Sequence, residues 1–203
     1  MLSNHRPPQF PSTHYDVVAL AASAGGLHAF LQVVQGLPAN FPAAVIIIQH
    51  LAPHRESLLP DIIQRYSILP VRHAKEGEVI EPGVVYTALP DYHMTVEADG
   101  RLHLNQEAPI NFSRPAIDPL IQSLANTYQN RLIAIILSGM GADGSKGVQS
   151  VKAVGGIVIV QNLETSEFTG MPSAAIRTGA TDYILPLESI SSALVSLVTT
   201  GAC

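Results

Sequence analysis

Three short runs of aliphatic residues, at 17–22, 45–48 and 133–137, constrain the fold of this chain more than any other feature. Each run consists of Val, Ile, Leu and Ala, without the alternating polar residues of a strand that has one face in water. Strands that helices cover on both faces have this composition. The runs therefore indicate the buried strands of a mainly parallel sheet.

The rest of the chain alternates short apolar runs with longer segments in which apolar residues recur at helical spacing. We expect strands at 16–22, 45–50, 132–138, 156–160 and 182–185. We expect helices at 26–36, 55–66, 116–129, 143–154, 172–179 and 187–199. This alternation predicts an α/β fold with a doubly wound, mainly parallel sheet and right-handed crossovers.

The segment at 70–110 departs from that alternation. It contains short stretches of alternating polarity at 83–88, 93–97 and 101–104, and Asp99-Gly100 between the last two is a strong hairpin signal. We expect a small antiparallel β patch attached to the main sheet. A segment of this length would hold little core by itself, so a single domain is expected.

Composition narrows the classes of function. The net charge of −5 gives no reason to expect a nucleic-acid partner, and no apolar run is long enough for a membrane-spanning helix. The one cysteine, Cys203, is the last residue, so neither an internal disulfide nor a thiolate metal cluster is expected. A flexible N-terminal arm at 1–15, rich in proline, and a cytoplasmic location are the simplest expectations.

A serine, a histidine and an aspartate follow three of the expected strands. Ser23 precedes Ala24-Gly25-Gly26, His50 ends the second strand, and Asp143 lies in the glycine-rich turn after the long aliphatic run. The carboxyl ends of parallel strands share one edge of a sheet, so these residues could converge there as a nucleophile, a base and an orienting acid. Structural roles stay open for each of them, namely helix N-caps for the serine and the aspartate and a satisfied structural residue for the histidine.

Three other kinds of site fit the letters poorly. A dinucleotide fingerprint lacks its first glycine, because Ala21 stands there, and it lacks the acidic residue after the second strand. The order Ser, His, Asp differs from that of the α/β-hydrolases, which also need a glycine at the position of Ala21. A metal site from His50 and His54 would need a helix that Pro53 disfavours.

At these residues the sequence resembles the catalytic domain of the chemotaxis protein-glutamate methylesterases, the CheB family. The resemblance runs from about 16 to about 198 and rests on six segments. They are Ala-Ser-Ala-Gly-Gly at 22–26, Gln-His-Leu at 49–51, Arg-Pro-Ala-Ile-Asp at 114–118, Leu-Ser-Gly-Met-Gly-Ala-Asp-Gly at 137–144, Gln-Asn at 161–162 and Gly-Met-Pro-Ser-Ala-Ala at 170–175. It implies a methylesterase catalytic domain at 16–203.

The implied activity is that of a serine hydrolase. It would remove methyl groups from glutamate esters on the cytoplasmic helices of chemoreceptors, and in some members it would also deamidate receptor glutamines; no cofactor or metal is implied. By motif, Ser23 is the nucleophile, His50 the general base and Asp143 the orienting acid. The site residues that the resemblance adds are the backbone oxyanion donors Ala24 and Met140 and the candidates for the substrate cleft, His93 and Met171.

The sequence also departs from the family pattern. Many members carry a hydroxyl residue at the position of Ala24, and about fifteen residues precede the first strand where the family usually has a receiver domain. Control by phosphorylation within this chain is therefore not expected. Ser-Ala-Gly-Gly at 23–26 and Glu-Ser-Leu-Leu-Pro at 56–60 resemble segments of long proteins that fuse the esterase to a receptor methyltransferase, so a stand-alone enzyme and a piece of such a fusion both stay open. A non-catalytic docking module of the same fold and a small-molecule carboxylesterase stay open as alternatives.

Overall fold

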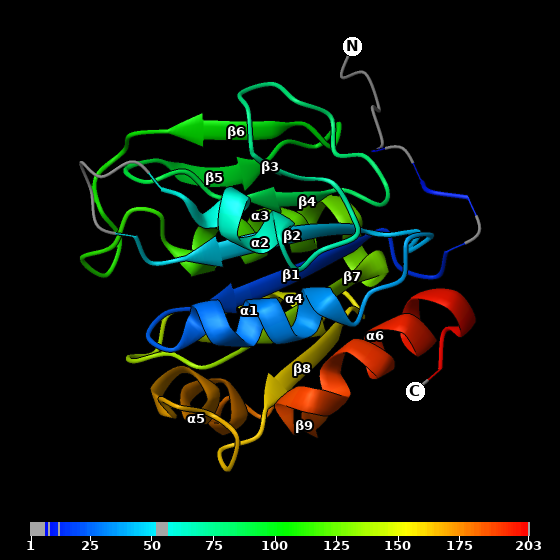
Figure 1. Ribbon diagram of the computed structural model, residues 1–203. Coiled ribbons are helices and arrows are strands. Elements are labelled where there is room, and N and C mark those ends of the chain that lie inside the picture. Colours follow the sequence, from blue (N-terminus) through cyan, green and yellow to red (C-terminus); the bar gives the residue numbers. More distant parts are fainter. Residues whose placement is uncertain (1–6, 8, 12, 52–56, 203) are drawn as a thin grey trace.

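A seven-stranded sheet forms the centre of the computed structural model, which describes residues 7, 9–11, 13–51 and 57–202. Every strand pair in this sheet is parallel, and the strand order is β3-β4-β2-β1-β7-β8-β9 (Figure 1). The strands are β1 (Val17–Ala22), β2 (Ala44–Gln49), β3 (Val71–His73), β4 (Val85–Thr87), β7 (Leu132–Ile136), β8 (Ile157–Gln161) and β9 (Tyr183–Leu185). The predicted parallel sheet is confirmed.

Helices cover both faces of this sheet. The residues of α1, α2 and α6 join one hydrophobic cluster, and those of α3, α4 and α5 join the other. The helices are α1 (Gly26–Gln35), α2 (Leu59–Gln64), α3 (Ile117–Tyr128), α4 (Ser145–Ala153), α5 (Gly170–Arg177) and α6 (Leu187–Thr200). A 3-10 turn, Gln129–Arg131, links α3 to β7. The fold is therefore doubly wound, as the sequence predicts.

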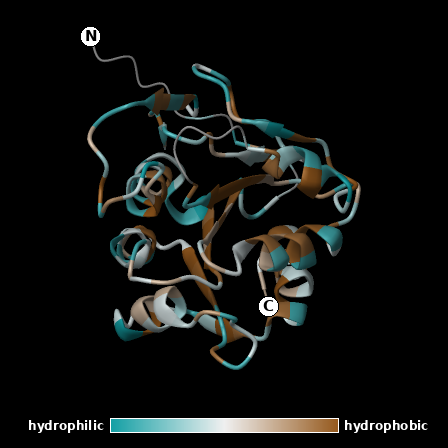
Figure 2. Ribbon diagram, turned by 60° about the vertical axis from the view of Figure 1, so that its left-hand side comes forward, coloured by the Kyte–Doolittle hydropathy of each residue, from teal (hydrophilic) through white to brown (hydrophobic). Residues whose placement is uncertain are grey.

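The residues of an aliphatic strand pack alternately against the helices on the two faces of the sheet. In β1, Val17 and Ala19 belong to the cluster beneath α3 and α4, whereas Val18 and Leu20 belong to the cluster beneath α1 and α6. Figure 2 shows the hydrophobic colour concentrated on the central strands. Because successive residues of a strand point to opposite faces, a strand with both faces covered must be apolar throughout.

The segment at 70–110 is only partly an antiparallel patch, and the expectation for 83–88 is corrected here. This stretch supplies β4, which runs parallel to β2 and to the unpredicted β3 in the main sheet. The strands β5 (His93–Val96) and β6 (Leu102–Asn105) form the expected antiparallel hairpin as a separate two-stranded sheet. With three residues each, β3 and β4 are too short for their periodicity to reveal which partners they take.

The segment between β2 and α2 also differs from expectation. The helix begins at Leu59 and not at 55, and it ends at Gln64. Residues 52–56 lie outside the described part of the chain, and they include His54, the second residue of the disfavoured metal site, and Pro53, which disfavours it.

The described residues before β1 make several contacts with the domain. Phe10 is buried, and its N–H donates to Asp16 Oδ1 at 3.0 Å. Arg131 pairs with the same carboxylate at 2.6 Å and donates to the carbonyl of Thr13 at 3.0 Å. A flexible arm stays a prediction for the rest of 1–15, because residues 1–6, 8 and 12 lie outside the described residues.

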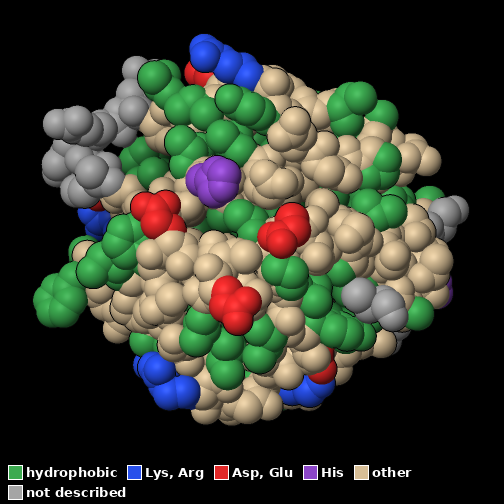
Figure 3. All heavy atoms as spheres, turned by 60° about the horizontal axis from the view of Figure 1, so that its bottom comes forward, with side chains coloured by type: hydrophobic (Ala, Val, Ile, Leu, Met, Phe, Trp, Pro, Cys, Tyr) green, Lys and Arg blue, Asp and Glu red, His purple; other side chains and the backbone are tan. Residues whose placement is uncertain are grey.

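The lengths of the helices and the charges on the surface bear on binding to membranes and to nucleic acids. None of the described helices combines the length and hydrophobicity needed to cross a bilayer. On the face shown in Figure 3, acidic side chains lie among hydrophobic ones, and Lys and Arg lie toward the margins. This face offers no cluster of cations of the kind that binds a polyanion.

Candidate active site

The strand order reverses direction at the centre of the sheet. β1 pairs with β2 on one side and with β7 on the other, and the chain then moves outward in opposite directions. In open α/β sheets a crevice forms at the carboxyl ends of the strands at such a point. Ser23 follows β1, His50 follows β2, and Asp143 lies in the turn between β7 and α4.

These three side chains meet in one chain of contacts. His50 Nδ1 lies 3.1 Å from Ser23 Oγ, and His50 Nε2 lies 2.8 Å from Asp143 Oδ2. A carboxylate only accepts hydrogen bonds, so Nε2 carries the hydrogen, and the neutral ring leaves Nδ1 free to accept the serine proton. The arrangement can take a proton from Ser23 and stabilise the imidazolium that forms.

Backbone groups fix the Asp143 carboxylate from the other side. Oδ2 also accepts from the N–H of Ile117 at 2.8 Å, and Oδ1 accepts from the N–H groups of Asp118 and Gly144, each at 3.0 Å. Two of these donors belong to the first turn of α3, where unpaired N–H groups and the helix dipole favour negative charge. Burial alone would raise the pKa of Asp143, but the hydrogen bonds from His50 and from this helix end hold it below its ordinary value.

Asp118 binds the amino end of the other helix, α4. Its Oδ1 accepts from the N–H of Gly147 at 2.8 Å, in the first turn of α4. Burial is the main cause that raises the pKa of Asp118, and the nearby charge of Asp143 adds to it, although the hydrogen bond from the Gly147 N–H acts in the opposite direction. Asp143 thus binds the amino end of α3, in which Asp118 lies, and Asp118 binds the amino end of α4, which follows Asp143. This role of Asp118 is not among those predicted from the sequence, although an acidic residue in a first helical turn is a recognisable signal.

The turn that carries Ser23 is held from β7. The Ser23 N–H donates to the carbonyl of Ser138 at 3.0 Å, and Ser138 Oγ donates to the carbonyl of Ala24 at 2.8 Å. Gly25 has a φ of 73°, and a Cβ there would lie 2.7 Å from Ser138 Oγ. Both the backbone conformation and the lack of space therefore require glycine at position 25, two residues after Ser23.

Ser138 is in turn held by Gln161 at the end of β8. Its N–H donates to Gln161 Oε1 at 2.9 Å, and Gln161 Nε2 donates to the carbonyl of Thr165 at 2.8 Å. Ser138 and Gln161 are both buried. Both residues lie in segments that carry the family resemblance, but their roles are not predicted from the sequence. A polar residue that closes an apolar strand is the signal that could have pointed to Gln161.

Two backbone donors face no partner near Ser23. Within the described part of the chain, the N–H groups of Ala24 and Met140 donate no hydrogen bond. The Met140 turn is anchored at Gly139, whose carbonyl accepts from the N–H of Met171 at 2.9 Å. A Cβ at Gly139 would lie 3.1 Å from the Cβ of Ser23, so this turn passes close to the serine. Both predicted oxyanion donors are thus free to bind a developing charge.

An open cavity of about 500 Å³ contains the three side chains. Its wall comes from the turn before α4, the start of that helix and the loop before α3. The lining residues are Ser23, His50, Asn111, Ser113, Asp118, Met140, Gly141, Ala142, Asp143, Ser145 and Lys146. A side chain of a partner molecule could therefore reach Ser23 from solvent.

His93 and Met171 are not among the residues that line this cavity. His93 is 2% exposed; its Nε2 donates to the carbonyl of Ala108 at 3.2 Å, and its Nδ1 accepts from the N–H of Ala116 at 3.3 Å. Met171 is 1% exposed, and its sulfur packs against Gly139. They support the loop before α3 and the Met140 turn from behind, so any influence on the cleft is indirect.

A family model and a solved structure that are similar to this chain carry the same description. A family model described as CheB methylesterase matches residues 18–194. A crystal structure of the Thermotoga maritima CheB methylesterase catalytic domain superposes with a TM-score of 0.87 at 37% identity, covering 91% of this chain and 99% of that chain.

Curated relatives extend the comparison. A Caulobacter vibrioides protein named protein-glutamate methylesterase/protein-glutamine glutaminase 2 is 37% identical over 194 residues, which cover 94% of this chain and 56% of that protein. A Pyrococcus abyssi protein named protein-glutamate methylesterase/protein-glutamine glutaminase is 38% identical over 89% of this chain and 50% of its own length. The chain thus spans about half the length of these two relatives.

Proposed function

Because the chain belongs to the CheB methylesterase family, we propose that it hydrolyses glutamate methyl esters on chemoreceptors and releases methanol. The observation that carries the proposal is the contact chain from Ser23 through His50 to Asp143 inside an open cavity. The names of the relatives support the choice of substrate.

The first half of the reaction forms an acyl-enzyme. Ser23 Oγ attacks the ester carbonyl carbon while its proton passes to His50 Nδ1, and Asp143 stabilises the positive charge on the ring. The carbonyl oxygen becomes an oxyanion, which the N–H groups of Ala24 and Met140 bind. Collapse of this intermediate breaks the bond to the methoxy group, which leaves as methanol with the proton held by His50.

The second half restores the enzyme. Water replaces methanol in the cavity, gives a proton to His50 Nδ1 and attacks the acyl carbon. The bond to Ser23 then breaks, the serine recovers its proton, and a free glutamate side chain remains on the receptor. A receptor glutamine would follow the same path with ammonia as the leaving group, which agrees with the double name of the relatives.

Release of methanol and ammonia from purified receptors tests this proposal. The substrates are receptors that carry glutamyl methyl ester or glutamine at the modified positions. Ser23→Ala should lower turnover by roughly four to six powers of ten, as for other lost nucleophiles. Ser192→Ala, which removes an exposed hydroxyl on α6, is the matched control and should leave turnover unchanged. Methanol release near the wild-type rate from Ser23→Ala would refute the assignment.

The same assay separates the alternatives. A docking module of this fold would bind receptors without releasing methanol, and a small-molecule esterase would hydrolyse simple esters but leave the methylated receptor intact. A cytoplasmic location and fusion or association with a receptor methyltransferase stay predictions from the sequence.

A further inference from the structure

A tight turn at 110–113 stands beside the cavity. Ile110 and Ser113 exchange two backbone hydrogen bonds, of 3.1 and 3.0 Å, across the intervening Asn111 and Phe112. Both central residues are left-handed, with φ values of 52° and 62°. Two successive residues with positive φ characterise the tightest hairpin turns, in which glycine and asparagine are the usual residues.

Phe112 is the unexpected residue in this turn. Its side chain is 101% exposed, so it contributes no burial to the folded chain. It also holds a left-handed conformation that bulky residues rarely adopt. Neither the packing nor the local conformation of the chain accounts for phenylalanine here. Such a residue points to a contact with another molecule.

The turn is continuous with the cavity. Asn111 and Ser113, the two neighbours of Phe112, line the same cavity as Ser23. Ile110 and Met140 are also exposed, at 39% and 63%, so large apolar side chains lie on and near the rim. A small ester inside the cavity would not need Phe112, because Phe112 is not among the residues that line it.

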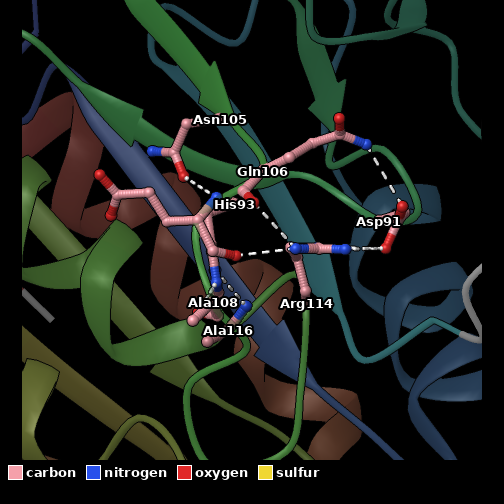
Figure 4. A network of polar contacts seen from close by, with 8 residues as sticks. Asp91, His93, Asn105, Gln106, Ala108, Arg114 and Ala116 are labelled. Carbon is pink, nitrogen blue, oxygen red and sulfur yellow. Dashed lines mark hydrogen bonds and ion pairs between the residues drawn. The ribbon is translucent and has the colours of Figure 1, made fainter.

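A polar network holds the base of the turn in place (Figure 4). Arg114 donates to Asp91 Oδ1 through Nη2 at 2.6 Å and through Nε at 3.1 Å. Its Nη1 donates to the carbonyls of Gln106 and Glu107 at 3.0 and 2.8 Å, and His93 binds the backbone on both sides of the turn. Phe112 is therefore presented on a braced loop, which reduces the entropy lost when it binds.

We propose that Phe112 is the docking residue for the protein that carries the ester. It inserts into an apolar hollow on the receptor surface next to the modified glutamate, while that glutamate enters the cavity and reaches Ser23. This inference rests on the proposed function and adds to it the surface by which a protein substrate is distinguished from a small ester. Buried aromatic anchors of this kind commonly dominate the affinity of protein interfaces.

Two substrates and two variants test the docking role. Phe112→Asn removes the aromatic ring but suits the left-handed turn, and Ile68→Asn is the matched control. Ile68 is 69% exposed in the connection from α2 to β3, at the opposite edge of the sheet from the cavity. Each variant is assayed with the methylated receptor and with p-nitrophenyl acetate as the small ester.

Phe112→Asn should lower kcat/KM for the receptor by roughly 10- to 100-fold, mainly through KM, as expected for loss of an anchor. Its hydrolysis of the small ester, and both activities of Ile68→Asn, should match the wild type. An unchanged kcat/KM for the receptor would overturn the docking role, and so would an equal loss with both substrates. A changed oligomeric state of Phe112→Asn would instead assign the ring to a second copy of the chain. If the wild type itself releases no methanol from the receptor, the proposed function fails, and the docking role that rests on it fails with it.

Discussion

Replacing Asp143 by asparagine changes the chemistry of the site while preserving its shape. Four donors point at the carboxylate, namely His50 Nε2 and the N–H groups of Ile117, Asp118 and Gly144. The asparagine NH₂ group cannot accept a hydrogen bond. If it takes the position of Oδ2, it opposes the N–H of Ile117 and forces the imidazole to accept at Nε2. The ring hydrogen then moves to Nδ1, which can no longer take the serine proton.

The expected cost follows from this tautomer. A histidine held in the wrong tautomer lowers kcat on the order of 10⁴-fold, which corresponds to about 5.5 kcal/mol of transition-state stabilisation. The unpaired N–H of Ile117 should lower the free energy of unfolding by about 1–3 kcal/mol.

Methanol release and thermal unfolding measure the two effects separately. Asp61→Asn serves as the control, because Asp61 is an exposed aspartate in the first turn of α2. It should match the wild type in turnover. If folded Asp143→Asn kept about a tenth of wild-type turnover, where the tautomer argument expects a loss on the order of 10⁴-fold, that argument would be wrong.

The remaining predictions address stability and the turns around Ser23. The folded state holds the pKa of Asp143 below its ordinary value of 3.8, so the stability that the carboxylate contributes is complete above pH 3.8 and is lost as the pH falls through the lower folded pKa. The difference in Tm between the wild type and Asp143→Asn should therefore narrow over that range. A constant difference would contradict this linkage. A Cβ in Gly139→Ala would lie 2.2 Å from the sulfur of Met171, and the displaced turn should cost at least about 10² in kcat. Adding Met171→Ala should restore part of that kcat, and no recovery in the double variant would argue against the clash. Ser138→Ala removes the hydroxyl that holds the Ala24 carbonyl and should lower the free energy of unfolding by about 1–3 kcal/mol in denaturant titrations, together with kcat; unchanged values would show that the hydroxyl is dispensable.

The buried parallel strands could be predicted because their composition reflects a property of the whole fold. Strands covered on both faces must be apolar throughout, and 17–22 and 133–137 show this without reference to any partner. β4 could not be identified in the same way. Its three residues are buried, and its partner strand β2 lies far away in the sequence, which the local pattern does not record.

Part of the candidate site could likewise be predicted from the sequence. Ser23, His50 and Asp143 could be predicted from topology, because each follows a central strand at the same edge of the sheet. The bond between Asp118 and the start of α4 depends on how two helices pack, so no spacing in the sequence reveals it. Which nitrogen of His50 faces the serine depends on the orientation of a ring and is visible only in the structure.

Covalent labelling with a fluorophosphonate probe tests the central claim, that Ser23 is a nucleophile activated through His50 and Asp143. We expect one adduct per chain, found by peptide mass spectrometry on the peptide that contains Ser23. The adduct should be absent in Ser23→Ala and much slower to form in His50→Gln. Labelling of another serine, or no labelling by an enzyme that still releases methanol from methylated receptor, would show that Ser23 is not the activated nucleophile.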